Sequence, residues 1–66
     1  MMNNIGEFIK KTREDRCISR SKLANMVGIA RTTLIAIEEG GDVKLDTLNR
    51  ILFQLGMELK VVKTKE

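Results

Sequence analysis

A tight turn that begins at Gly28 separates two short stretches of helical spacing, and this pattern restricts the fold more than any other feature of the chain. The stretches cover residues 20–27 and 31–38, and Gly28 stands where a helix often ends on a left-handed residue. Ala24 is small enough to allow a close helix crossing. The inner stripe of the first helix is predicted to be Leu23, Ala24 and Val27, and the residues predicted to pin the two helices together are Val27, Ile29, Leu34 and Ile37. Such a pair at a tight turn is the helix-turn-helix unit, here over about residues 20–39, and an ordinary helical hairpin is the alternative.

Two further helices and one strand are predicted around this unit. Asn4, with Glu7 three residues later, forms a capping-box pattern that starts a helix fading near residue 16. A fourth helix is expected over residues 45–55, with Gly56 at its end. The residues expected to face inward on these two helices are Ile5, Phe8, Ile9, Thr12, Leu45, Leu48, Ile51, Leu52 and Leu55. Residues 57–62 then alternate with a period of two, which predicts a half-buried strand.

The length of 66 residues favours one domain, covering residues 1–66, with a core that is marginal by itself. Cys17 is the only cysteine and there is no histidine, so we expect neither a disulfide nor a metal site. Oligomerisation is the remaining source of stability, and we expect a homodimer.

The predicted strand suggests how two subunits would meet. Nothing else in the sequence reads as a strand, and an unpaired strand leaves its backbone N–H and C=O groups without partners. An antiparallel pair across a two-fold axis needs only one sequence. The predicted dimerisation residues are Met57, Leu59, Lys60, Val61 and Val62.

Positive charge gathers in the first half of the chain. Residues 10–31 hold seven basic and two acidic residues, although the whole chain has a net charge of only +3. This distribution fits either a solvated surface or a phosphate-binding surface.

Other functional classes find little support in the sequence. Without histidine, a phosphate-binding loop or recognisable paired carboxylates, we expect neither an enzyme nor a cofactor. No apolar run approaches a membrane span and the N-terminus does not read as a signal peptide, so a cytoplasmic location is expected.

The chain resembles the Cro/cI-type helix-turn-helix family, also called the XRE family, over about residues 5–56. The resemblance rests on Ile5-Gly6 with Ile9 and Arg13, on residues 18–24, on Gly28-Ile29 and on residues 37–40. It implies a mainly α, compact four-helix, lambda-repressor-like DNA-binding domain whose third helix enters the major groove. The family usually has glutamine where Arg20 stands and often glycine where Cys17 stands. It also pairs residues in the positions of Arg13 and Glu38 structurally.

The docking mode of the motif then predicts DNA contacts. Arg31 would bind either guanine or a phosphate, and Arg20 and Ser21 would hold phosphate at a helix N-terminus. The residues predicted to contact DNA are Arg20, Ser21, Arg31, Thr32, Thr33, Ile35 and Ala36.

Three roles for such a DNA-binding protein remain open. The fourth helix and following strand are similar to HipB-like antitoxins, which implies a type II toxin–antitoxin operon, autoregulation and a HipA-like kinase toxin as partner. A stand-alone repressor, of phage type or controlling a restriction–modification system, is the second. The third is an interaction module that uses the acidic residues Glu38, Glu39, Asp42 and Asp46.

Overall fold

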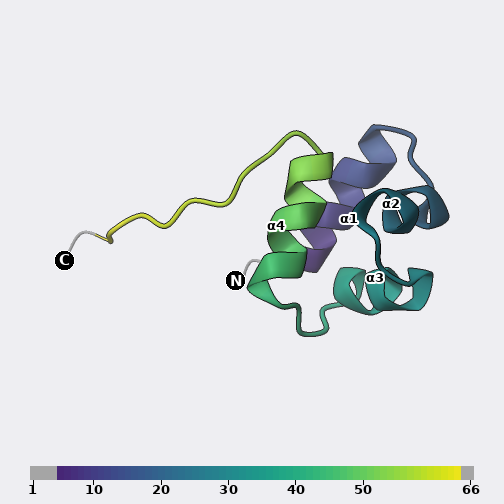
Figure 1. Ribbon diagram of the computed structural model, residues 1–66. Coiled ribbons are helices and arrows are strands. Elements are labelled where there is room, and N and C mark those ends of the chain that lie inside the picture. Colours follow the sequence, from purple (N-terminus) through teal and green to yellow (C-terminus); the bar gives the residue numbers. More distant parts are fainter. Residues whose placement is uncertain (1–4, 65–66) are drawn as a thin grey trace.

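A computed structural model describes residues 5–64, which contain four helices and no strand (Figure 1). The helices are α1 (Ile5–Asp15), α2 (Arg20–Val27), α3 (Arg31–Glu38) and α4 (Leu45–Gln54). The predicted compact four-helix fold is confirmed. The proposed capping residue Asn4 lies outside the described residues. None of the described helices is long and apolar enough to cross a membrane.

The two helices of the predicted motif begin and end where the sequence pattern places them. Ser19 precedes α2 and its hydroxyl accepts a hydrogen bond from the backbone N–H of Lys22 at 3.0 Å, so one of the free N–H groups of the first turn is satisfied. Gly28 ends α2 in the left-handed region, with φ of 86°. The chain enters α3 three residues later, which makes the turn tight.

All four helices end next to a residue with positive φ, and one of these residues is not glycine. Gly28, Gly40 and Gly56 follow α2, α3 and α4, whereas Cys17 follows α1 with φ of 56°. The N–H of Cys17 donates to the carbonyl of Glu14 at 2.9 Å, and the next N–H donates to the carbonyl of Arg13 at 3.1 Å. This is the hydrogen-bond pattern of a Schellman motif. The turn after α1 is therefore formed, but with a side chain in a conformation that favours glycine.

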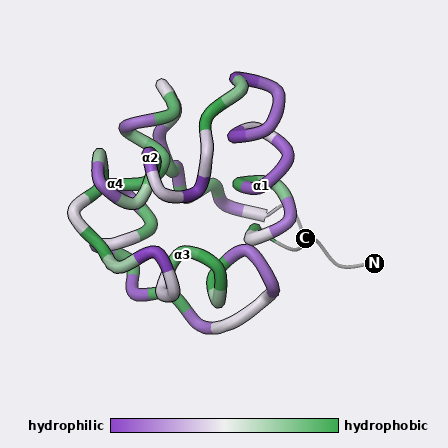
Figure 2. Tube along the Cα trace, turned by 90° about the vertical axis from the view of Figure 1, so that its right-hand side faces the viewer, coloured by the Kyte–Doolittle hydropathy of each residue, from purple (hydrophilic) through white to green (hydrophobic). Residues whose placement is uncertain are grey.

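The core is built where α2 packs on both α3 and α4 while α1 packs on α3. Figure 2 shows hydrophobic and hydrophilic residues alternating along these helices. The buried apolar side chains are Ile9, Leu23, Ala24, Val27, Leu34, Ile37, Ile51, Leu52 and Leu55, with Ile18, Ile29, Val43, Leu48 and Met57 packed against them. The predicted inward residues of the motif are confirmed.

The contact between α1 and α3 depends on Gly6, which is buried in the first turn of α1. A Cβ atom at this position would collide with the carbonyl oxygen of Ile37 and would lie only 3.0 Å from its carbonyl carbon. The absence of a side chain thus sets how closely α1 approaches the end of α3.

Three predicted core residues are exposed instead. Leu45 is 63% exposed because it opens α4, whose buried residues lie in its second half. Ile5 and Phe8 lie beside the buried face of α1, which Gly6, Ile9 and Arg13 form.

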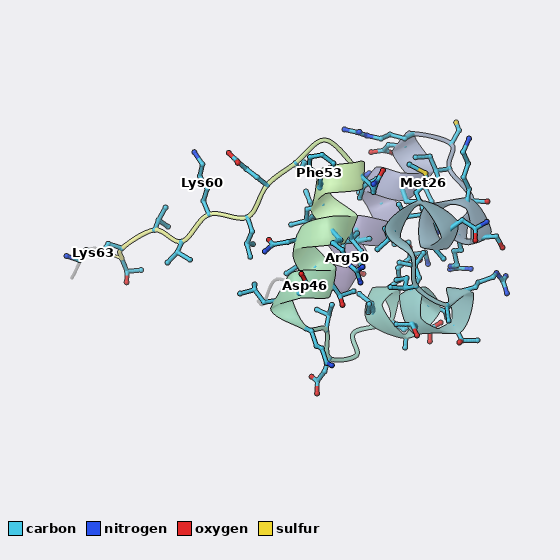
Figure 3. The ribbon with its side chains drawn as sticks, in the orientation of Figure 1. Met26, Asp46, Arg50, Phe53, Lys60 and Lys63 are labelled. Carbon is cyan, nitrogen blue, oxygen red and sulfur yellow. The ribbon has the colours of Figure 1, made fainter. Side chains whose placement is uncertain are left out.

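The predicted strand over residues 57–62 is wrong for the single chain. No strand is present within residues 5–64, and a strand needs a neighbour to receive its backbone hydrogen bonds. The segment instead runs away from the helices, with Lys60 and Lys63 far from the core (Figures 1 and 3). Only its first residue, Met57, packs against the core, and the N–H of Met57 donates to the carbonyl of Leu52 at 2.8 Å.

Candidate nucleic-acid interface

The outer face of α3 carries most of the residues predicted to contact DNA. Arg31, Thr32, Thr33 and Ala36 are exposed, and Ile35 is half-buried. The opposite face of the same helix is buried through Leu34, Ile37 and Glu38. One face of α3 is therefore fixed to the core while its N-terminal half presents short polar side chains and one arginine to solvent.

Arg31 has no ion pair or side-chain hydrogen bond within the described residues. Its guanidinium therefore keeps all its donors, and a fork of donors matches the O6 and N7 acceptors of guanine in the major groove. Thr32 and Thr33 beside it add hydroxyl and methyl groups. The N-cap of α3 is Ala30, which makes no side-chain capping bond, and the Thr33 side chain has no hydrogen bond within the described residues.

A buried ion pair fixes the far end of α3. Arg13 of α1 donates from Nε to Glu38 Oε2 at 2.7 Å and from Nη2 to Glu38 Oε1 at 3.2 Å. Its third nitrogen, Nη1, donates to the carbonyl of Ile18 at 2.8 Å. The structure brings the two residues of the predicted pair into contact, and the same arginine also holds the chain between α1 and α2.

Arg20 is part of this cluster, which the sequence interpretation missed. Its Nε donates to Glu38 Oε1 at 3.0 Å, so one carboxylate accepts hydrogen bonds from two arginines. Arg20 opens α2 and remains 31% exposed, whereas the side chain of Glu38 is fully buried. The predicted phosphate-binding arginine is thus attached to the end of the helix that was predicted to read bases.

The two arginines determine the charge state of Glu38. Burial by itself raises the pKa of the carboxyl, but hydrogen bonds from Arg13 and Arg20, together with their charges, outweigh it. The net result is a pKa below the ordinary value of 4.5. Glu38 is therefore a carboxylate at neutral pH.

The remaining predicted residues separate into two groups. Ser21 is exposed in the first turn of α2, next to Arg20, and is accessible to an anion. In the C-terminal segment, Leu59, Val61 and Val62 are exposed and Lys60 pairs with Glu58 at 3.8 Å. The structure therefore places Arg20 and Ser21 side by side in the first turn of α2, while the predicted dimerisation residues after Met57 are all exposed.

Two features that the sequence interpretation missed are the close helix contact at Gly6 and the hydrogen bond from Arg20 to Glu38. Gly6 is a lone glycine inside a helical pattern, which often marks a close packing contact. The pairing of Arg20 with Glu38 had no comparable sign, because the two residues lie eighteen positions apart and meet only through the crossing of α2 and α3. No group of metal-ligating side chains gathers in the part of the chain that the structure describes.

Two short helices at a tight turn, with the second presenting an exposed N-terminal face, define a helix-turn-helix protein. Comparison with known families agrees: residues 6–66 match a family described as a helix-turn-helix domain. The chain belongs to this family and is a helix-turn-helix protein of the XRE type.

A curated relative comes from Methanosarcina acetivorans and is named as an HTH-type transcriptional regulatory protein. It is 38% identical over 55 residues, which cover 82% of this chain. The chain spans only 17% of the length of that relative.

Proposed function

We propose that this protein is a sequence-specific DNA-binding transcriptional regulator, acting by binding and without catalysing a reaction. The observation that carries the proposal is the outer face of α3, where Arg31, Thr32 and Thr33 are exposed on a helix whose other face is fixed to the core. A rigid helix presenting donors at its N-terminal half suits entry into the major groove. The name of the longer archaeal relative supports the same role. Its place of action would be the cytoplasm, where its DNA target lies.

We further propose that it binds as a homodimer joined through residues 57–62. The apolar side chains at the end of this segment are almost uncovered in the single chain: Val61 is 97% exposed and Val62 is 78% exposed. Antiparallel pairing with the same segment of a second copy would satisfy its backbone groups and cover part of this apolar surface. Such pairing would also fix the distance between the two α3 helices.

For the biological role we favour a repressor that is the antitoxin of a HipBA-like type II operon. The support is the direct passage from α4 into a segment of strand-like alternation, as in the HipB-like group that the sequence resembles. Its partner would be a HipA-like kinase toxin. The alternative is a stand-alone repressor of phage type or of a restriction–modification system.

DNA recognition is tested by selecting bound duplexes from a random pool. The expected result is enrichment of a two-fold symmetric site with half-sites about one helical turn, roughly 34 Å, apart. Footprinting on the enriched sequence should protect both half-sites. Equal recovery of all sequences at moderate salt would rule out sequence-specific recognition.

The antitoxin role is tested separately by co-expression with the product of the adjacent gene. A stable complex with a kinase-like protein, together with suppression of its toxicity, is the expected result. If the neighbouring gene encodes no such protein, or no complex forms while DNA binding is intact, the stand-alone repressor replaces the antitoxin.

A further inference from the structure

The cluster of Arg13, Arg20 and Glu38 is asymmetric in a way that points to an external anion. All three nitrogens of the Arg13 guanidinium donate within the protein, to Glu38 and to the carbonyl of Ile18. Arg20 donates from Nε alone, so neither Nη1 nor Nη2 has a hydrogen-bond acceptor within the described residues. The cluster therefore has one satisfied arginine and one with two remaining donor groups.

Charge and burial show the same asymmetry. Arg13 and Arg20 share the Glu38 carboxylate, and Arg13 alone has a second carboxylate nearby, that of Glu14, which is 57% exposed and lies 3.8 Å from Arg13 Nη2. The side chain of Arg13 is 7% exposed and that of Glu38 is fully buried, so Arg20, at 31%, is the arginine whose guanidinium faces solvent. Glu38 accepts a hydrogen bond from Nε of Arg20. The edge of the Arg20 guanidinium that Nη1 and Nη2 form is therefore available to a second acceptor.

We propose that Glu38 positions Arg20 as an anchor for a backbone phosphate of DNA, with Nη1 and Nη2 as the donors. Glu38 closes α3 and Arg20 opens α2, so the anchor is attached directly to the helix whose outer face would read bases. A phosphate held there sets the position of α3 relative to the duplex. This inference rests on the proposed DNA-binding function and assigns to Glu38, a residue that never touches DNA, a role in binding it.

The test compares Arg20→Met with Lys22→Met on folded protein. Both variants remove one positive charge from the first turn of α2, but Lys22 is exposed and has no side-chain partner in the described chain. Affinity for a random-sequence duplex is measured by fluorescence anisotropy between 50 and 200 mM salt. Loss of one phosphate contact lowers the slope of log affinity against log salt concentration by about 0.9. Between 50 and 200 mM salt, the affinity of the wild type should therefore fall by a factor about 3.5 times larger than the affinity of Arg20→Met. Lys22→Met should change the slope clearly less.

The positioning role of Glu38 has a test based on the sign of the effect. Glu38→Gln and Glu39→Gln each remove one negative charge at the end of α3, and Glu39 is exposed. If charge alone mattered, both variants would bind DNA more tightly. We expect Glu39→Gln to bind more tightly and Glu38→Gln to bind roughly 2- to 10-fold more weakly, because Arg20 must then be ordered at the moment of binding.

Each outcome has a distinct meaning when far-UV circular dichroism confirms the fold. A wild-type protein that binds no duplex at 50 mM salt overturns the proposed function itself. Binding by the wild type with equal effects of Arg20→Met and Lys22→Met overturns the anchor alone. Tighter binding by Glu38→Gln overturns the positioning role, and if that variant does not fold, the Arg20 and Lys22 pair still tests the anchor.

Discussion

The helix-turn-helix and the segment after α4 both carry amphipathic patterns, yet only the first is organised by its own chain. The pattern in α2 and α3 meets α1 and α4, which cover it with apolar side chains, and Glu38 joins α3 to both α1 and α2. In residues 57–62 only Met57 is partly buried against the core, and Leu59, Val61 and Val62 stay exposed. Figure 3 shows this separation between the helical body and the segment carrying Lys60 and Lys63.

The difference shows that a periodic pattern of apolar residues specifies a local structure only where another part of the protein can pack against those residues. A helix satisfies its own backbone groups, so α2 and α3 need partners only for their apolar faces. A strand needs a partner for its backbone as well. The stability of the helix-turn-helix should therefore depend on substitutions within the chain. If the proposed dimer forms, the structure of residues 57–62 should depend on the protein concentration.

The largest expected effect is the disruption of the organised region by Gly6→Ala. The added Cβ collides with the carbonyl oxygen of Ile37, which is backbone and cannot rotate away, so α1 and α3 must separate. We expect a loss of about 3 kcal/mol or more in the free energy of unfolding, measured by urea denaturation. Gly28→Ala is the control, because its Cβ would meet no atom within 4 Å and only the left-handed φ of 86° would be strained, at about 1–2 kcal/mol. Equal losses would show that the close contact at Gly6 is not what matters.

Removing residues 59–66 tests the region that lacks a partner. Met57 and its hydrogen bond to Leu52 are retained, so the helical content of the monomer should be unchanged. If the segment joins two subunits, dimerisation should weaken by about 2 kcal/mol or more, since burying a Leu or Val contributes about 1.5–3 kcal/mol. Analytical ultracentrifugation of both proteins measures this difference. A truncated protein that dimerises like the full chain would place the interface elsewhere.

Acid should weaken the organised region through Glu38. Its pKa is lowered in the folded protein, so its contribution to stability is fully present above the ordinary value of 4.5 and is lost as pH falls through the folded value. The melting temperature should therefore fall when the pH is lowered below about 4.5. Glu38→Gln should flatten this dependence, whereas Glu39→Gln, at an exposed position, should leave it intact. An unchanged slope in Glu38→Gln would mean that other groups control acid unfolding.

The smallest expected effect is a gain. Cys17 occupies the left-handed position after α1 that glycine occupies after the other three helices. Cys17→Gly should raise the free energy of unfolding by about 1 kcal/mol, because glycine adopts this conformation without the penalty of a Cβ atom. Cys17→Ala keeps the Cβ and should leave stability nearly unchanged, which separates backbone strain from loss of the thiol. A similar gain in both variants would assign the effect to the thiol.

The sequence predicted the fold best where local rules and packing agree. Ser19 and Gly28 bound α2 by capping chemistry that acts within a few residues, and the predicted limits of α2 and α3 match the structure. The prediction that Leu45 faces inward was wrong, because periodicity cannot show how far along α4 the core extends. The predicted strand over residues 57–62 is absent from the single chain. Alternation of polar and apolar residues indicates that a segment can form a strand, but it does not show which segment would pair with it.

The candidate site was predictable in its outer part and not in its supporting part. Exposure of Arg31 and Thr32 follows from the inward placement of Leu34 and Ile37 on a short helix. The hydrogen bond from Arg20 to Glu38 depends on the crossing of α2 and α3, which no local pattern encodes. Family resemblance supplied the Arg13–Glu38 pair, but this chain has arginine where the family usually has glutamine, and that departure adds Arg20 to the cluster.

The central claim is that the outer face of α3 reads bases, and Arg31→Ala tests it most directly. The enriched site from the random pool and a scrambled duplex are compared by competition binding, for the wild type and for the variant. If Arg31 grips a base, the variant should lose about 1–3 kcal/mol of discrimination and tolerate any base at one position of each half-site, while affinity for scrambled DNA changes little. If affinity for both duplexes falls equally, Arg31 contacts only phosphate and the claim that it reads a base is contradicted.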